Sequence, residues 1–385
     1  MAGKILKRVA LFSVMAVLFA FGSAGETRAL AADDLQGEAA EVGYAFGDVS
    51  FSGSLEASVK TGANRQGKNG DYKNTKLYVG GMPFGVKFLT EGVIVSGFND
   101  NAMGEEKNPA RAAGLQINDI IVSINGEQII GAAELNETVG RCGGRTMTVN
   151  YTRGGRELTS ALTPVYSETE GRYSLGIYVR DSGAGIGTVT FIVPETQAFA
   201  GLGHGICDST TGRLIPMQRG SVVGVKINGI VKGLSGSPGE VKGYFNSGKT
   251  GTLLGNTDCG VYGVFAQLPK GVSSAEPVSL GLRNSVKDGK AYVYTQLDGD
   301  KVEKYEVEIS DIQREATGNK CFTVRVTDKR LISKTGGIIQ GMSGSPLVQN
   351  GKLIGAVTHV LINDPTTGYG IFIENMLNQM GDLSS

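Results

Sequence analysis

After Pro164 the chain is a series of short apolar runs separated by glycines and polar turns, and this pattern constrains the fold more than any other feature. Runs rich in Val, Ile and Phe lie at residues 186–193, 222–231, 252–254, 261–267, 291–297, 304–309 and 323–327. Short runs at such spacing are typical of strands in a barrel or sandwich. Glycine supplies 59 of the 385 residues and tryptophan is absent, as in turn-rich β proteins. We therefore expect a mainly β protein, with one helix at 372–380.

A serine flanked by glycines lies near the C-terminus, in the segment Gly341-Met342-Ser343-Gly344-Ser345-Pro346. Glycines allow a tight turn here, and amides outside regular pairing can then point at an oxyanion. Apolar residues on both sides of the following Asn350-Gly351 turn predict a β-hairpin that supports the serine turn. Ser343 is therefore the candidate nucleophile, and the amides of Gly341 and Ser343 are the candidate oxyanion donors.

The same glycine-serine pattern occurs a second time, at residues 233–238, and it offers Ser235 as an alternative nucleophile. Only Gly-Glu-Val-Lys-Gly follows this second copy, so no strand is predicted to support it. Because a nucleophile needs a rigid platform, the sequence favours Ser343 over Ser235.

A serine nucleophile needs a general base, and the chain contains two histidines, His204 and His359. His204 precedes Ser343 by 139 residues (343 − 204), and the histidine-first, serine-last order is that of chymotrypsin-like enzymes. His359 lies on the strand predicted after the serine turn, and its alternative roles are a packed strand histidine, a substrate-pocket residue or the base itself. The spacing alone does not decide between the two histidines.

The N-terminal segment has the pattern of an export signal. Lys4, Lys7 and Arg8 precede an apolar run at 9–24, which is shorter than the roughly 20 residues of a spanning helix, and Ala29-Leu30-Ala31 suits signal peptidase. We expect residues 1–31 to be a signal peptide or membrane anchor. Residues 32–74 are polar and rich in small residues, which predicts a linker.

Residues 75–164 have the pattern of a PDZ domain. The glycine-rich stretch Gly80-Gly81-Met82-Pro83-Phe84-Gly85-Val86 resembles a PDZ carboxylate-binding loop, and residues 109–115 and 118–126 match the short helix, turn and strand of the PDZ core. A second helix is expected at 133–139. Such a module leaves a strand edge open beside a helix, so we predict peptide binding at Met82, Pro83, Phe84, Gly85 and Val86.

The composition excludes other classes of function. The formal net charge is zero and no basic stripe is present, which argues against nucleic-acid binding. The glycines at 183–187 lack the setting of a dinucleotide loop, and the four cysteines form no Cys-x-x-Cys pair, so we expect neither cofactor nor metal. In an exported chain a disulfide among Cys207, Cys259 and Cys321 remains open.

Several segments together resemble one protein family. Five segments are similar to the stage IV sporulation protein B (SpoIVB) peptidases. They are the serine turn, the residues before it at 326–330, the residues after it at 355–360 and 363–370, and the His204 segment at 201–205. The resemblance spans nearly the whole chain. It implies a chymotrypsin-like double β-barrel for residues 165–385, with His204 as base and Asp328 as the acid that orients it. Asp208 and Asp364 are the alternative acids.

The resemblance also implies a biological setting. Members are released into the space between forespore and mother cell, cleave themselves, and cut a membrane-held inhibitor of an intramembrane metalloprotease, which activates a late sigma factor. In that setting the PDZ domain would hold the enzyme's own N-terminal segment and then its target. The alternatives are a non-catalytic PDZ adaptor with a degenerate protease fold and a periplasmic quality-control protease, although the latter predicts a PDZ domain after the catalytic domain.

Overall fold

The computed structural model describes residues 72–100, 108–207, 212–270, 272 and 275–381. The predicted signal peptide and nearly all of the predicted linker lie outside these residues. Within the described ranges, no helix is long and apolar enough to cross a membrane.

The first unit is a six-stranded antiparallel barrel. Neighbouring strands pair in a closed circuit, β2–β9–β10–β13–β12–β11 and back to β2. The strands are β2 Pro83–Phe98, β9 Ile177–Ile192, β10 Ala198–Gly201, β11 Met217–Val231, β12 Glu240–Thr257 and β13 Gly260–Phe265. Outside this circuit, β1 (Lys76–Val79) pairs with both β9 and the short strand β14 (Val278–Ser279).

The second unit is also a closed barrel, with the strand order β15–β16–β17–β20–β19–β18. Its elements are β15 Gly289–Thr295, β16 Glu303–Ser310, β17 Phe322–Val326, β18 Pro346–Gln349, β19 Lys352–Leu361, β20 Asp364–Phe372, the 3₁₀ turn η3 Arg283–Ser285, and helices α5 Lys329–Thr335 and α6 Ile373–Met380. The alternation of buried and partly exposed residues along β15 and β16 follows the two-residue period of a barrel wall. The expected mainly β double barrel is confirmed.

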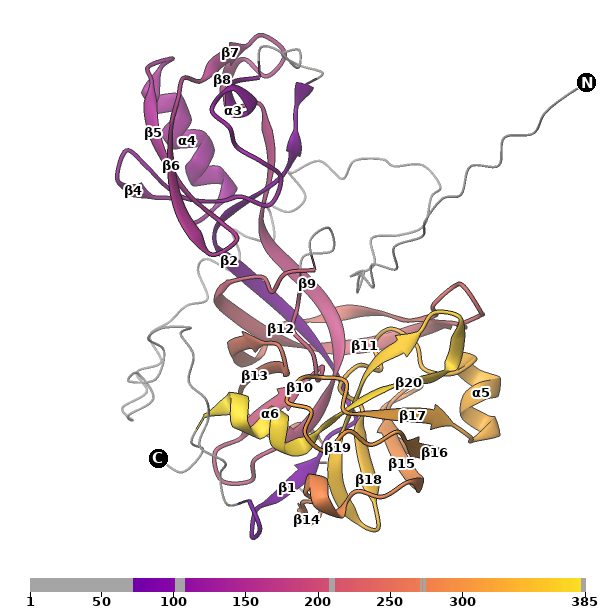
Figure 1. The fold of residues 1–385 in the computed structure, drawn as a ribbon. Coiled ribbons are helices and arrows are strands. Elements are labelled where there is room, and N and C mark those ends of the chain that lie inside the picture. Colours follow the sequence, from indigo (N-terminus) through magenta and orange to yellow (C-terminus); the bar gives the residue numbers. More distant parts are fainter. Residues whose placement is uncertain (1–71, 101–107, 208–211, 271, 273–274, 382–385) are drawn as a thin grey trace, which may run out of the picture.

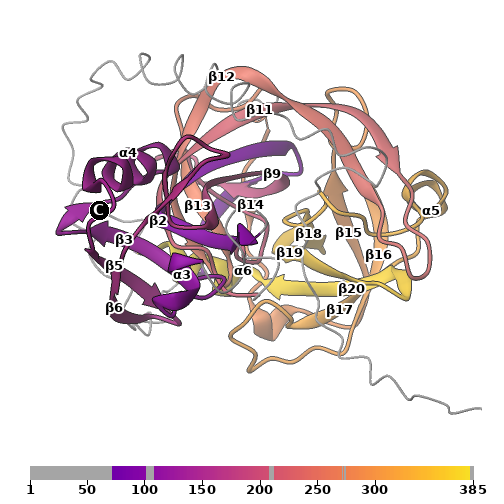
Figure 2. The ribbon, with the colours of Figure 1, turned by 90° about the horizontal axis from the view of Figure 1, so that it is seen from above.

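A third unit is inserted into the first barrel between β2 and β9. It contains α3 Pro109–Ala112, β3 Ile120–Ile124, β4 Glu127–Gln128, α4 Ala132–Cys142, β5 Met147–Arg153, β6 Arg156–Leu162, β7 Val165–Ser167 and β8 Arg172–Ser174. The far halves of β2 and β9 complete its sheet, and Figures 1 and 2 show this unit projecting from the first barrel, away from the second barrel. The predicted helix at 133–139 is part of α4.

This insertion differs from the predicted boundaries, in which one domain occupied 75–164 and the next began at 165. Phe84, Val86 and Phe88 pack in the core of the first barrel, while Val93 and Val95 on the same strand pack in the inserted unit. Ile177 and Val179 likewise contact the inserted core. A continuous strand gives no composition change at the boundary, so the sequence pattern could not locate it.

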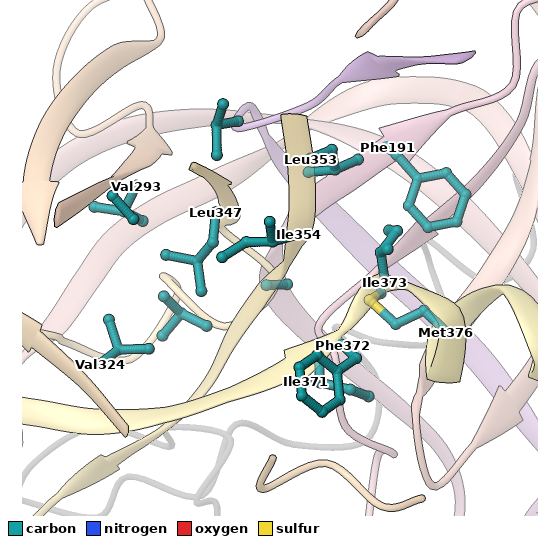
Figure 3. Close-up of a cluster of buried hydrophobic side chains, with 14 of the residues drawn as sticks. Phe191, Val293, Val324, Leu347, Leu353, Ile354, Ile371, Phe372, Ile373 and Met376 are labelled. Atoms are coloured by element: carbon teal, nitrogen blue, oxygen red, sulfur yellow. The ribbon is translucent and has the colours of Figure 1, made fainter. Parts of the chain in front are cut away.

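The largest hydrophobic cluster fills the second barrel and extends to the first. Figure 3 shows Leu347, Leu353, Ile354 and Phe372 of the second barrel, with Phe191 of β9 beside them. The predicted hairpin is β18–β19, with Asn350 and Gly351 both at positive φ in its turn. This buried hairpin supports the loop before it, where the candidate nucleophile lies.

Candidate active site

The candidate nucleophile loop joins α5 to β18. It is anchored by Met342, whose side chain is fully buried in the core of the second barrel. Gly341 and Gly344 have φ of +96° and +93°, in the region that favours glycine. At Gly344 a Cβ would lie 2.1 Å from the carbonyl oxygen of Thr188 on β9, so no larger residue fits. The loop therefore sits directly against the first barrel.

Ser343 lies at the junction of the two barrels with a partly exposed side chain. Its Oγ donates a hydrogen bond of 2.8 Å to the carbonyl oxygen of Thr358 on β19. The hydroxyl is thus held in place but is engaged with backbone rather than with a histidine.

His204 lies in the loop after β10, on the other side of the same junction. Leu202 and Gly203 before it have φ of +66° and +70°, and the left-handed conformation at a leucine is a local strain. A Cβ at Gly203 would lie 2.9 Å from Cγ2 of Thr358, the residue whose carbonyl holds Ser343. The turn therefore places Gly203, the neighbour of His204, against the residue that holds Ser343.

The hydrogen bonding of His204 defines its tautomer. Its Nδ1 lies 2.9 Å from the carbonyl oxygen of Gly205, and because a carbonyl only accepts, Nδ1 holds the proton. Nε2 then has its lone pair free, and it is buried with no hydrogen-bond partner among the described residues. Burial lowers the pKa of His204 below its usual 6.5. The imidazole is therefore a neutral acceptor, as a general base must be.

His359 stacks beside His204, with ring centroids 5.0 Å apart. It lies on β19 opposite Tyr369, and its Nδ1 is also buried without a partner in the described structure. Burial is the main cause that lowers the pKa of His359 to about 3, and the nearby Lys320 ammonium adds to it. The two predicted bases are thus neighbours, and the structure leaves the choice of His204 a prediction.

Asp328, the predicted orienting acid, contacts neither histidine. It is the N-cap of α5, where it accepts from the Arg330 amide, and it forms an ion pair with the Arg330 guanidinium at 2.8 Å. The hydrogen bond from Arg330 is the main cause that lowers the pKa of Asp328 to about 2. This prediction is corrected: the Val-Thr-Asp segment serves helix capping, a common use of aspartate that sequence cannot distinguish from catalysis.

Of the two alternative acids, the structure describes only Asp364. Asp364 accepts from the hydroxyls of Thr366 and Thr367 in the turn that begins β20. Asp208 lies outside the described residues. The carbonyl of Gly205 therefore stands where a triad carboxylate would bond the histidine, and it can fix the tautomer although it supplies no full negative charge.

The two amides predicted as oxyanion donors have no backbone partner in the described structure. The Gln340 carbonyl accepts from the Val241 amide at 2.9 Å, and in a planar trans peptide the next amide, that of Gly341, points the opposite way. Neither the Gly341 amide nor the Ser343 amide has a backbone acceptor within the described ranges. An acyl-transfer transition state requires such unpaired donors, and the assignment of these two amides stays a prediction.

Ser235 lies elsewhere, at the exposed tip between β11 and β12. Its Oγ donates to the carbonyl of Asn363, and the Gly236 amide donates to that of Ile362, so this loop rests on the β19–β20 turn. These contacts give it no base.

The predicted peptide-binding residues are also corrected. Pro83 to Val86 pair with β9 on one side, and Gly85 and Val86 pair with β11 on the other, while Met82 accepts from the Val189 amide. Gly85 and Val86 therefore have no free edge for a peptide, and Phe84 is buried in the core of the first barrel. A glycine-rich stretch before an apolar strand fits a barrel wall as well as a PDZ loop, which is why the pattern misled.

The open edge of the inserted unit belongs to β9 instead. Ile177 to Arg180 pair with β2 on one side, and within the described residues no strand pairs with their other side. The N-terminus of helix α4 lies beside this edge, because Asp181 of β9 accepts a hydrogen bond from the Ala132 amide, while Tyr173 of β8 lies against Gly144 beyond the other end of the helix. Leu175-Gly176-Ile177, an apolar-glycine-apolar triplet before an alternating strand, was the signal that sequence reasoning missed.

The remaining candidates are simple to place. All four cysteines are thiols, so the disulfide left open by the sequence is not formed here. In the described ranges, no group of three or more His, Cys, Asp or Glu side chains could hold a metal ion.

Comparison with known proteins gives two family matches. The model of the SpoIVB peptidase S55 family matches residues 171–377, more than half of the chain, and a PDZ-domain model matches residues 82–163. The PDZ match begins at Met82, although the packing of Phe84 assigns that end of β2 to the first barrel. No protein with a curated description matches.

Solved structures show weaker similarity. The active form of the Rv3671c protease from M. tuberculosis is 16% identical, covers 53% of this chain and 75% of its own, and has a TM-score of 0.31. The PDZ domain of the SdrC-like protein Lmo2051 from Listeria monocytogenes is 22% identical, covers 23% of this chain and 87% of its own, and has a TM-score of 0.20. The HtrA-type protease AlgW with a tripeptide is 16% identical, with coverages of 51% and 55% and a TM-score of 0.30.

Proposed function

The chain belongs to the SpoIVB peptidase S55 family and contains a PDZ domain. We propose that Ser343 and His204 cleave the peptide bond and that the PDZ domain selects the protein to be cut. The chain is a PDZ-containing serine endopeptidase. The single observation that supports the assignment of the site is the junction itself, where Ser343 from one barrel and His204 from the other converge around Thr358.

In the proposed mechanism, Ser343 Oγ leaves the Thr358 carbonyl and donates to Nε2 of His204. The imidazole takes the proton as Oγ attacks the scissile carbonyl, and it then returns the proton to the leaving amine. The Nδ1 hydrogen bond to Gly205 keeps the ring in the required tautomer. Water then hydrolyses the acyl-enzyme by the same route.

The amides of Gly341 and Ser343 stabilise the oxyanion in this scheme. Each such donor is worth about 3 kcal/mol of barrier in comparable sites. The donors are fixed before substrate arrives, because the carbonyls around them are already bonded to the first barrel.

We further propose the family's setting for this chain. The basic and apolar pattern of residues 1–31 supports export, which would deliver the enzyme to the space between forespore and mother cell. There it would cleave itself and then a membrane-held inhibitor of an intramembrane metalloprotease, and so activate a late sigma factor. The open edge of β9 would first hold the N-terminal segment and then the target.

The test compares two serines in the same sequence pattern. Ser343→Ala should lose peptidase activity by about a thousandfold or more and should lose labelling by a fluorophosphonate, because it removes the nucleophile. Ser235→Ala is the matched control and should retain both. Full activity in Ser343→Ala with loss in Ser235→Ala would reverse the assignment, and absence of labelling in folded wild-type protein would favour the non-catalytic adaptor.

A further inference from the structure

Strand β9 belongs to two units of the molecule. Its first residues, including Ile177 and Val179, pack against the core of the PDZ domain. Its last residues, including Val189 and Phe191, are fully buried in the cores of the two barrels. One uninterrupted strand thus runs from the open PDZ edge to the catalytic junction (Figure 1).

The catalytic end of β9 holds the nucleophile loop through two buried threonines. Thr188 donates its amide to the Ser343 carbonyl at 3.0 Å and its Oγ1 to the Gly341 carbonyl at 2.7 Å. Thr190 donates its Oγ1 to the Gly344 carbonyl at 2.7 Å. These bonds orient the peptides on both sides of the nucleophile.

Thr188 also contacts the histidine side of the site. Its carbonyl accepts from the amide of Leu202 at 3.2 Å, two residues before His204. A single residue of β9 is therefore bonded to both segments that must be aligned for proton transfer. Because alignment to within a fraction of an ångström governs rate, a small shift of Thr188 has a direct consequence for chemistry.

The middle of β9 packs closely at its inward-facing glycines, while every second residue from Tyr178 to Ala184 is exposed. A Cβ at Gly183 would lie 2.5 Å from the Phe88 ring, and one at Gly187 would lie 2.1 Å from Cδ2 of Leu202. The glycines at 183–187, which the sequence left without a function, let the strand pack this closely. Through these inward contacts a displacement of β9 would reach Phe88 and Leu202 of the first barrel.

The side chain of Asp181 ties the PDZ end of β9 to helix α4. The N-cap residue Gly131 supplies no side-chain hydrogen bond of its own, and Asp181 accepts from the Ala132 amide at 2.9 Å instead. A peptide that adds to β9 beside α4 would lie next to the Asp181–Ala132 hydrogen bond. Peptide binding would therefore displace β9 directly.

We propose that β9 couples the PDZ edge to the nucleophile loop, and that Thr188 is the positioning residue through which it acts. This regulation rests on the proposed peptidase function of Ser343 and His204.

The first test removes the Thr188 hydroxyl without changing the shape of the side chain. Thr188→Val should lower kcat about tenfold with KM within about twofold, because one hydrogen bond that aligns the loop is lost. Thr188→Ser should restore kcat. The matched control Thr250→Val removes a hydroxyl bonded to the Val222 carbonyl in the same barrel and should leave kcat unchanged. Equal effects of Thr188→Val and Thr250→Val would overturn the positioning role.

The second test is a double-mutant cycle between the two ends of β9. Asp181→Ala, measured in full-length protein, should lower kcat about threefold in the wild-type background and have no further effect in Thr188→Val. Glu157→Ala, an exposed site on the far PDZ strand β6, is the control and should have no effect in either background. Independent effects, or no effect of Asp181→Ala in wild type, would overturn the coupling.

The two proposals fail in different ways. If fluorophosphonate labelling persists in Ser343→Ala, the proposed nucleophile is wrong. If labelling requires Ser343 but the rate of labelling is the same in wild type, Thr188→Val and Asp181→Ala, the peptidase assignment stands and the coupling through β9 fails.

Discussion

At the scale of the residue, the state of His204 sets the pH dependence of the proposed reaction. Burial lowers the pKa of His204, so the imidazole stays neutral at pH values where a free histidine with a pKa of 6.5 is protonated. The acid limb of kcat/KM should therefore lie below pH 6.5, measured on a peptide substrate from about pH 8 down to about pH 5. His359→Gln should leave the position of that limb unchanged. An apparent pKa at or above 6.5 would contradict a buried His204 base. A shift of the acid limb in His359→Gln would assign the role of general base to His359.

At the scale of the element, Asp328 belongs to helix α5 rather than to the catalytic site. Asp328→Ala should cost about 1 kcal/mol of unfolding free energy, because the cap is lost, whereas its ion pair with the exposed Arg330 adds little. Its kcat/KM should stay within about twofold of wild type at temperatures where the protein is folded. Urea unfolding and a peptide assay on the same samples measure both quantities, with Asp364→Ala as a second acid-to-alanine variant. A folded Asp328→Ala protein that had lost about a hundredfold in activity would restore the triad interpretation.

At the scale of the whole molecule, the PDZ domain is inserted into the first barrel. Residues 82–86, which the sequence assigned to peptide binding, therefore belong to the wall of that barrel, and the open PDZ edge lies on β9. Phe84 is 2% exposed and packs edge-on against Phe199 at 5.6 Å, so Phe84→Ala should destabilise the barrel by about 3 to 5 kcal/mol. Tyr178, on the PDZ half of β9, is 54% exposed, and Tyr178→Ala should change stability by less than about 0.5 kcal/mol.

Peptide binding distinguishes the same two sites. Tyr178→Ala should weaken binding of a fluorescent synthetic peptide of residues 32–60 several-fold, measured by anisotropy, because an exposed ring on the open edge is lost. Phe84→Ala should reduce binding only as far as it unfolds the protein. The reverse pattern, with normal binding in Tyr178→Ala and none in a folded Phe84→Ala protein, would return the peptide site to residues 82–86.

The sequence alone determined the class of fold, the family and the local shape of the nucleophile loop. Glycine-bounded apolar runs allow little but antiparallel strands, and the glycines around Ser343 allow little but a tight turn, so both predictions depend on residues close together in the chain. The hairpin with its Asn350-Gly351 turn was predictable for the same reason.

Tertiary structure decided which residues meet. Asp328 is a residue type that can serve as a triad acid, but its position makes it the cap of a helix. Phe84 lies in a stretch that resembles a PDZ loop, but it packs in the core of a barrel. In both cases the role of the side chain depends on partners distant in sequence. The convergence of His204, His359 and Ser343 around Thr358, and the strand that ties this junction to the PDZ edge, result from closing two barrels against each other. No local pattern specifies such contacts, since their geometry is set by packing between strands more than a hundred residues apart.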